Sequence, residues 1–466
     1  MEAEASGSYL TQYLPDGRVL QNANDWYAGV IEACANLAKT MPDFAKRIIG
    51  IGVAGIGWSV VPVDAHGDPI SPVSIWLDTS ATQEVAQIRR VIDDEQVFRV
   101  AGNPLMANYL TPKLLKYKNE INSTYAKTSK FLNSNSYISY RLTGIMTQEY
   151  SQSYGYHFFD IRRRVFAADL CVIMGLDPNK MPDLTESHAV IGTVTDGAAK
   201  ETGLLVGTPV VAGGLDAACA ALGVGAISEG DTQEQGGQAG GMGICTDTCI
   251  PNRQLITGCH VVPGKWLLQG GTVGGGNALR WLKDGVLFDQ NRSFLLLDSL
   301  AESVPQGAGG LTFLPYLQGE RSPIWDTEAK GIFHGISYRT TKAHFVRAVM
   351  EGVAYSLRHN LETAQASGVE VRELLSTGGA SQSPLWMQIK SNVCGLPLKS
   401  TKRDIATPLG AALLAGVGIG LYPDFSNAVK RTVQYAKTYF PDRESHEFYS
   451  DGYQKYLAIY QRLKGL

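Results

Sequence analysis

The chain lacks the features that mark membrane, secreted and nucleic-acid-binding proteins. No apolar run reaches the roughly 18 residues that a membrane-spanning helix needs, and the first ten residues, MEAEASGSYL, have neither the basic nor the apolar region of a signal peptide. The formal net charge is only −3, which argues against a general nucleic-acid binder, because such proteins carry a strongly basic surface. We therefore expect a cytoplasmic protein that binds neither membranes nor nucleic acid.

Cysteine is also scarce. Seven cysteines are spread over 466 residues, an odd number without the spacing of a disulfide framework. Cys245, Cys249, Cys259 and His260 lie close together in the sequence, but their spacing matches no zinc pattern and strand-like residues surround them. Buried strand thiols are the expectation for this region, and no metal ligand is assigned.

Glycine, by contrast, is abundant: the 51 glycines exceed the usual share of roughly 7%. They gather after strand-like segments, which favours tight turns near ligands. GIGVAG (50–55) has the G-x-G-x-x-G form, but it runs from one predicted strand into another, so a dinucleotide-binding fold is not supported. GCHVVPGKW (258–266) has neither the spacing of a P-loop nor a Ser or Thr after its Lys.

The length and the alternation of strands and helices predict two α/β domains, 1–225 and 226–466. In the first, helical periodicity covers 25–39 and most of 80–145, with breaks at 102–104 and 143–144, and a strand pair at 48–56 and 59–64 is followed by a strand at 70–79. In the second, strands are expected through 231–272 and at 373–377, and helices at 276–284, at 341–366 and from Ser383-Pro384.

Three glycine-rich segments of the second domain offer consecutive backbone N–H groups that can hold phosphate oxygens. They are GGQAGG (236–241), QGGTVGGGNALRW (269–281) and TGGASQSPLW (377–386). The last two lead into predicted helices, whose N-termini also favour anions. Each segment taken alone is more simply a tight turn, but three in one domain favour a nucleotide site.

Asp216 lies between a predicted strand and a predicted helix in VVAGGLDAACAALGVGAISEGD (210–231). Unpaired N–H groups and the helix dipole are expected to stabilise its charged form, and Gly213 and Gly214 to let another molecule approach the backbone. A charged carboxylate in a cleft is suited to removing a proton from a substrate hydroxyl. Asp is equally a favoured helix cap, and this run alone does not choose between the two roles.

Several segments appear in one consistent order over nearly the whole chain: IGVAGIGWSVVPVDAHGDPISPVSIWLDT, TPKLLKYKNE, QEYSQSYGYHFFD, GTPVVAGGLDAACAALGVG, FLPYLQGERSPIWDTEAKGIFHGIS, LLSTGGASQSPLWMQIKSNVCGLPL and PLGAALLAGVGIGLY. In this order the chain resembles the FGGY family of carbohydrate kinases, most closely its xylulokinase-like branch. The resemblance implies two actin-like (ribonuclease H-like) domains flanking a central cleft. It also implies transfer of the γ-phosphoryl group of ATP to a sugar or polyol hydroxyl, with Mg²⁺.

The resemblance assigns roles to individual residues. Asp216 falls at the catalytic base, and the positions that contact the sugar are Gly57, Trp58, Tyr150 and Asp216 itself. The positions that contact the nucleotide are Gly237, Gln238, Gly276, Arg280, Gly379 and Ser383. Asp78 matches an acidic family position, for which we expect a structural role.

The chain departs from the family pattern in three places. Gln238-Ala239 replaces a Thr-Ser pair after the glycine of the phosphate loop, and Gly57-Trp58 replaces a Met-His sugar pair. A Trp there could stack on the C–H face of a sugar. The family's amino-terminal hairpin with an Asp-x-Gly-Thr phosphate loop has no counterpart ahead of GSYLTQYLPDGRVL (7–20), which predicts a first domain shortened at its amino terminus.

Two functions of different classes therefore stay open. One is an ATP-dependent kinase of a pentulose such as xylulose or of a similar polyol. The other is a catalytically weakened, kinase-like protein that binds sugar or nucleotide without the first phosphate loop. An actin-like filament or chaperone ATPase would share the fold, but the GERSP and WLDT segments count against it. The implied partners are a small-molecule sugar or polyol and a second copy, since homodimers are common in the family.

Overall fold

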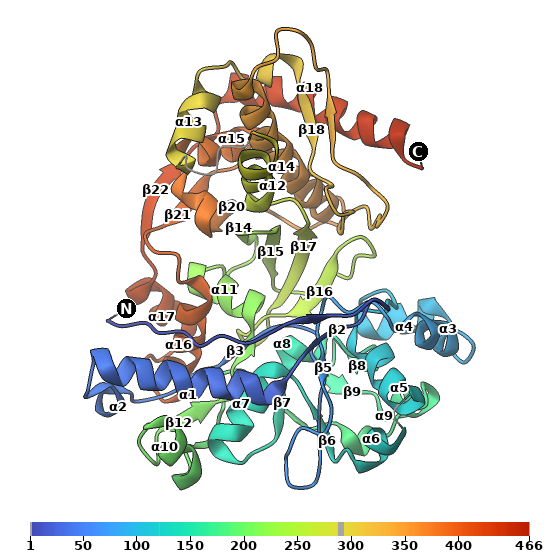
Figure 1. The fold of residues 1–466 in the computed structure, drawn as a ribbon, viewed down its shortest axis with the longest axis vertical. Helices are drawn as coiled ribbons and strands as arrows, with labels where there is room; N and C mark the ends of the chain where they lie inside the picture. Colours follow the sequence, from blue (N-terminus) through green and yellow to red (C-terminus); the bar gives the residue numbers. More distant parts are fainter. Residues whose placement is uncertain (1, 121, 288–292, 466) are drawn as a thin grey trace. The chain divides into compact units, whose positions relative to one another are not determined.

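The computed structural model describes residues 2–120, 122–287 and 293–465, and it forms two compact units (Figure 1). Unit 1 comprises Met1–Gly223, Thr257–Trp266 and Thr407–Arg431; unit 2 comprises Val224–Ile256, Leu267–Ala406 and Thr432–Leu466. Two segments from later in the chain thus belong to unit 1. The division of the chain into two domains at residue 225 stays a prediction.

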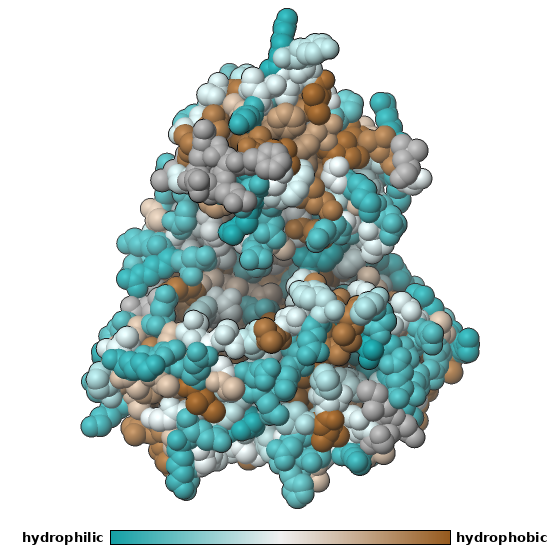
Figure 2. Space-filling view, viewed as in Figure 1, coloured by the Kyte–Doolittle hydropathy of each residue, from teal (hydrophilic) through white to brown (hydrophobic). Residues whose placement is uncertain are grey.

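Most of the visible surface is hydrophilic or neutral, with hydrophobic residues in small patches (Figure 2). No helix within the described residues combines the length and the apolar character needed to cross a membrane.

Helix α1 (Ala23–Thr40) of unit 1 confirms the helix predicted at 25–39. The Asn22 side chain caps it by accepting a hydrogen bond from the N–H of Asn24. Its inner face buries Trp26, Tyr27 and Cys34 in the hydrophobic core of the unit. The apolar face of the helix is thus the one that is removed from water.

The strands of unit 1 are shorter than predicted, and they pair differently. β3 (Ala54–Gly55) is parallel to β13 (Gly214–Leu215), and β4 (Val61–Val63) is antiparallel to β6 (Lys130–Leu132). The predicted pairing of 48–56 with 59–64 is therefore wrong. Trp58 lies between them with a φ of 51°, and this left-handed turn sends the two segments to different partners.

Helices fill most of 80–145 as predicted: α3 (Thr82–Ile88), α4 (Asp94–Ala101), α5 (Leu110–Glu120), α6 (Asn122–Lys127) and α7 (Ser134–Thr143). Gly102 and Gly144 end α4 and α7 in the left-handed conformation, where each glycine N–H donates to a carbonyl of the last turn. Both predicted breaks are confirmed.

The remaining elements of unit 1 are short. They are β1 (Gln12–Tyr13), β2 (Val19–Gln21), α2 (Phe44–Arg47), β5 (Val73–Ser74), β7 (Thr147–Glu149), α8 (Tyr150–Ser153), β8 (Phe159–Asp160), β9 (Val165–Phe166), α9 (Ala168–Ile173), η1 (Pro178–Lys180), β10 (Asp183–Thr185), β11 (Val190–Thr193), α10 (Asp196–Thr202) and β12 (Pro209–Val211). Helices α11 (Asp216–Val224), α16 (Ala406–Gly418) and α17 (Phe425–Thr432) have most of their residues in unit 1.

Strands in the order β17-β15-β14-β20-β21-β22 form the centre of unit 2. They are β14 (Asp231–Gly236), β15 (Gly240–Thr246), β17 (Trp266–Thr272), β20 (Glu373–Thr377), β21 (Leu398–Thr401) and β22 (Tyr435–Tyr439). The seventh strand of this sheet, β16 (Ile256–Cys259), has three of its four residues in unit 1. β14, β20 and β21 are parallel neighbours. Their carboxyl ends therefore lie at one edge of the sheet, where parallel sheets usually bind ligands.

Helices cover this sheet. α14 (Lys342–Gln365) contacts β15, α13 (Phe294–Glu302) and α15 (Pro384–Cys394), and α15 contacts α18 (Arg443–Leu463) (Figure 1). The remaining elements are α12 (Gly276–Trp281), η2 (Leu282–Val286), η3 (Ala308–Gly310), β18 (Thr312–Leu314), β19 (Ile332–His334) and η4 (Gly379–Gln382). The strands predicted in 231–272 and at 373–377 and the helices predicted at 341–366 and from Ser383 are confirmed.

Candidate active site

Asp216 begins α11, directly after β13. Since β13 is parallel to β3, with Leu215 opposite Gly55, the chain leaves both strands at the same edge. Gly57 follows β3 at that edge, and a methyl group added to it would lie 2.9 Å from the Leu215 side chain. The structure thus brings the segment of Gly57 next to that of Asp216.

Burial controls the ionisation of Asp216. It raises the pKa of this carboxyl group to about 6, and the hydrogen bond from the N–H of Ala217 (2.7 Å) only partly offsets the rise. The hydrogen bond from Ala217 favours the charged form in the predicted direction, but desolvation outweighs it, so the pKa of Asp216 is raised. The bond to Ala217 is also not a conventional cap, which accepts from the second or third helical residue.

The glycines before Asp216 do not leave the open approach that the sequence predicted. Gly213 has a φ of 81°, and an added methyl group would collide with the carbonyl of Val53. A methyl group on Gly214 would lie 2.5 Å from the Val261 side chain. These glycines allow close packing within unit 1.

A buried polar network supports the strand that carries Asp216. Ser151 of α8 accepts a hydrogen bond through Oγ from the N–H of Leu215 (2.8 Å). The Glu149 carboxylate accepts from the N–H groups of Ser151 (2.5 Å) and Gln152 (3.0 Å), and from the hydroxyl of Ser187 (3.1 Å). Burial raises the pKa of Glu149 to about 7. Glu149 and Ser151 lie in QEYSQSYGYHFFD, a segment that resembles the kinase family, but the sequence pattern indicates no role for either residue.

Tyr150, between those two residues, is half-buried. The guanidinium carbon of Arg164 lies 5.8 Å from its ring centre. Tyr150 directly precedes Ser151, which binds the strand that leads to Asp216. Its role in sugar binding stays a prediction.

The Trp58 ring is buried rather than displayed: 7% of the residue is exposed, and its ring centre lies 4.1 Å from that of Tyr109. Lys113 holds its backbone, since Nζ donates to the carbonyl oxygens of Trp58 (2.9 Å) and Ile75 (2.6 Å). Burial lowers the pKa of Lys113 to about 7. Sequence reasoning missed Lys113, because a lysine is rarely expected in a protein interior.

Asp78 is buried and accepts hydrogen bonds from the hydroxyls of Ser74 and Ser80, both at 2.7 Å, and from the N–H of Ser80 at 2.9 Å. These local bonds fix the turn after β5, which agrees with the expected structural role.

Unit 2 contains a cavity of about 500 Å³ beside the carboxyl ends of β14, β20 and β21. Its lining includes all six residues predicted to contact nucleotide: Gly237, Gln238, Gly276, Arg280, Gly379 and Ser383. The volume lies within the range of small-molecule sites, roughly 300–1,000 Å³. That these residues bind nucleotide stays a prediction.

The three glycine segments of unit 2 meet beside this cavity. The N–H of Gly276 donates to the carbonyl of Gly237 at 2.8 Å. A methyl group on Gly275 would overlap the backbone of Ala239 and Gly240, and one on Gly378 would lie 2.7 Å from the carbonyl carbon of Gly236. The backbones approach so closely because these residues lack side chains.

Several lining residues were not predicted, among them Phe294, Asp298 and Asp404. Asp404 accepts hydrogen bonds from the N–H of Gly378 (2.9 Å) and the hydroxyl of Thr377 (3.0 Å). Its signal was its position just after β21, the third parallel strand of this edge. Ser383 donates to Asp298 (2.8 Å) and caps α15 by accepting from the N–H of Trp386 (3.1 Å).

No group of three or more His, Cys, Asp or Glu residues, within the part of the chain that the structure describes, is arranged to hold a metal ion. Cys245 and Cys259 are buried, and His260 accepts a hydrogen bond through Nδ1 from the N–H of Val262 (3.1 Å).

Solved structures of carbohydrate kinases share this fold. The xylulose kinase from Rhodospirillum rubrum aligns with a TM-score of 0.90 and 28% identity, over 98% of this chain and 92% of that one. The xyloylose kinase from Brucella ovis aligns with a TM-score of 0.90 and 27% identity, over 98% and 94%. The fold is therefore the two-domain, actin-like fold of carbohydrate kinases.

Sequence comparisons identify the family. Models for the N-terminal and C-terminal domains of the FGGY family of carbohydrate kinases match residues 3–223 and 241–419. The xylulose kinase of Staphylococcus epidermidis is 30% identical over 96% of this chain and 89% of its own length, and that of Bacillus subtilis is 30% identical over 100% and 93%. The chain belongs to the FGGY family of carbohydrate kinases. A shortened first domain stays a prediction.

Proposed function

We propose that this carbohydrate kinase transfers the terminal phosphoryl group of ATP to a hydroxyl group of a pentulose such as xylulose, or of a similar polyol. One observation carries the proposal: the six residues expected to hold the nucleotide come from distant segments and line one cavity of about 500 Å³. The similarity to xylulose kinases at 30% identity supports a pentulose as the substrate class.

The residues of the cavity fit ATP. Consecutive N–H groups at the glycine turns and the Arg280 guanidinium would hold phosphate oxygens. Beside Gly379 no atom lies within 4 Å of an added methyl group, so a flat base has room against the backbone. Mg²⁺ would be held mainly by phosphate oxygens and would neutralise phosphate charge when bound. We assign it no protein ligand.

Asp216 would act as the general base. Its carboxylate accepts the proton of the sugar hydroxyl while the hydroxyl oxygen forms a bond to the terminal phosphorus atom and the bond from phosphorus to the leaving oxygen of ADP breaks. A pKa of about 6 keeps most of this group ionised at neutral pH while leaving it a stronger base than an ordinary aspartate. Ser151 and Glu149 would hold the strand before it in place.

A coupled assay of ATP consumption over a panel of pentuloses, aldoses and polyols tests the proposal. We expect the highest kcat/KM for a pentulose. Turnover only with another class of sugar would reject the substrate assignment. Absence of turnover, with sugar or nucleotide still raising the melting temperature, would support the catalytically weakened binding protein instead. The Gln238-Ala239 replacement in the predicted phosphate loop is the feature that would favour that outcome.

A further inference from the structure

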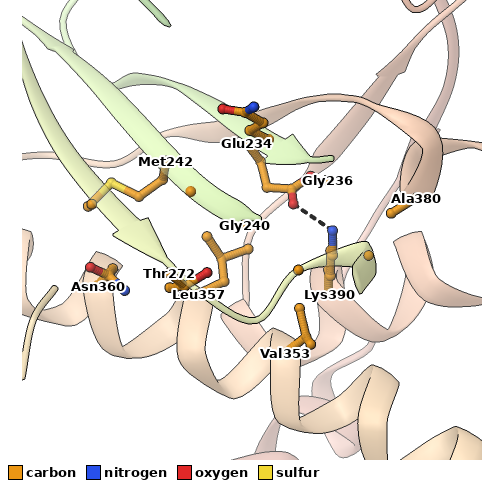
Figure 3. A pocket seen from close by; sticks show the side chains of 15 residues that line it. Glu234, Gly236, Gly240, Met242, Thr272, Val353, Leu357, Asn360, Ala380 and Lys390 are labelled. Atoms are coloured by element: carbon orange, nitrogen blue, oxygen red, sulfur yellow. Dashed lines mark hydrogen bonds and ion pairs between the residues drawn. The ribbon is translucent and has the colours of Figure 1, made fainter. Parts of the chain in front are cut away.

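A buried ion pair lies at the base of the glycine turns in unit 2. Glu234 of β14 and Lys390 of α15 have side chains that are only 4% and 2% exposed, and Lys390 Nζ lies 2.5 Å from Glu234 Oε1 (Figure 3). Ser376 of β20 donates its hydroxyl to the other oxygen of the same carboxylate. Glu234 therefore connects two parallel strands and a helix.

Stability alone gives a weak reason for this pair. Removing two charges from water is costly, and well-packed apolar side chains in their place are often as stable or more stable. A buried pair can instead be retained because it fixes one geometry among several, which is a hypothesis to be tested in each protein. The surroundings of this pair indicate which geometry that is.

Only a thin layer of backbone separates the pair from the nucleotide cavity. Glu234 and Lys390 line a second, water-sized cavity of about 10 Å³, and Gly236, Gly276 and Ala380 line both this cavity and the larger one. A methyl group added to Gly236 would lie 2.8 Å from the Ala380 side chain and 3.3 Å from Lys390 Nζ. Lys390 thus lies directly behind the turn that faces the larger cavity.

Through Ser376, the pair is also connected to both strands that lead into the predicted phosphate and adenosine turns. β14 ends at Gly236, just before Gly237 and Gln238, and β20 ends at Thr377, just before Gly378 and Gly379. A change in spacing between these strand ends would change where the N–H groups of both turns point.

We propose that Glu234 and Lys390, together with Ser376, are positioning residues for nucleotide binding, which hold the turn after β14, the turn after β20 and helix α15 in one arrangement. This inference rests on the proposed function, in which the cavity of about 500 Å³ binds ATP. It predicts a change in the affinity for the nucleotide and no change in the affinity for the sugar.

The test replaces the whole buried polar group by apolar side chains in the variant E234M/K390M/S376A, which leaves no partner unpaired. We expect a melting temperature near or above that of the wild type. We expect the Kd for ADP and ATP, measured by calorimetry, to rise about tenfold or more, which is about 1.4 kcal/mol. KM for ATP should rise with it, while the Kd and KM for the sugar stay within about twofold.

The matched control is E373M/K399M, which removes a half-buried ion pair of the same sheet (Nζ to Oε2, 2.6 Å) whose residues do not line the nucleotide cavity. Its Kd for nucleotide should stay within about twofold of the wild type. If the triple variant does not fold, S376A alone removes one bond to Glu234, and a two- to threefold rise in Kd is expected.

Each outcome has a distinct meaning. Wild-type affinity in the triple variant, or in S376A where the triple variant does not fold, would overturn the positioning role, as would an equal loss in the control. A wild-type protein that binds neither ADP nor ATP would instead overturn the proposed function.

Discussion

At Asp216, two effects of opposite sign act on one carboxyl group. The N–H of Ala217 favours its charged form, whereas burial disfavours it more strongly and raises its pKa to about 6. A base is most efficient when its pKa approaches the working pH, provided that it is still ionised there. The environment that disfavours the charge in the folded protein therefore suits the proposed chemistry.

Replacing this carboxylate is the first prediction. D216N keeps the shape and the acceptor for Ala217 but removes the base, so kcat should fall by roughly 10²–10⁴. Sugar and nucleotide affinities, measured by calorimetry, should change by less than about threefold. D169N is the control, since Asp169 lies in the first turn of α9 but is exposed, and its kcat should be unchanged. Full activity in D216N would remove Asp216 from the mechanism.

The second prediction concerns pH. Because the base must be ionised, kcat should rise as the pH increases through about 6 and level off above 7. The stability of the fold has the opposite pH dependence. The pKa of Asp216 is about 6 in the folded state and 3.8 in the unfolded state, so the folded state binds more protons between these two pH values. The folded state therefore loses stability as the pH rises through this range.

D216N, which has no such proton, should therefore melt above the wild type at pH 8 and close to it at pH 4. Melting curves across this range provide the measurement. A wild-type protein that is more stable than D216N at pH 8 would show that the Asp216 charge is favourable in the fold.

The roles of some residues could be predicted from the sequence, and the roles of others could not. Asp216 could be predicted because a strand, two glycines, an acid and an alanine-rich segment are adjacent along the chain. Lys113 and Glu149 could not, because their importance comes from burial, and charged residues are seldom buried. Their partners, Trp58 and Ile75 for Lys113 and Ser187 for Glu149, are 38 to 55 positions away.

Among the elements, the parallel strands β14, β20 and β21 decide where the larger cavity forms. The sequence indicated each glycine turn separately, and it placed strand and helix around two of them correctly. It could not show that Gly237 contacts Gly276, or that Gly236 contacts Gly378, since those contacts depend on strand order. The short strands of unit 1 were overestimated because apolar runs such as 48–56 contact helices as well as strands: Gly52 lies against Ala411 of α16.

The third prediction uses these close backbone contacts. G275A adds a methyl group that would overlap the backbone of Ala239 and Gly240, so the turns must separate. Overpacking of this kind costs typically 1–3 kcal/mol, and the Kd for ATP should rise at least tenfold. In G243A, on β15 of the same sheet, the added methyl group meets its nearest atom at 3.6 Å, an ordinary contact. G243A should bind ATP as the wild type does, and equal losses in both variants would exclude a specific role for the turn contact.

In the whole molecule, unit 1 contains Asp216 and unit 2 contains the cavity proposed for the nucleotide, so ligand-induced stabilisation should distinguish the two roles. A ligand at 100 times its Kd stabilises the folded state by about 2.7 kcal/mol. In R280A we expect the rise in melting temperature caused by ATP to be lost and the rise caused by the sugar to be retained. If both rises in melting temperature are lost, or if both are retained, the assignment of Arg280 to the nucleotide is contradicted.

The division of the chain between the units has a consequence for how the protein is made. Unit 1 needs Thr257–Trp266 and Thr407–Arg431 in addition to its first 223 residues. A ribosome that adds about 5–20 residues per second must reach position 431 before this unit can complete its contacts. We expect a gene fragment ending at codon 223 to yield an incomplete fold, and the nascent chain to need protection from aggregation until translation is nearly finished.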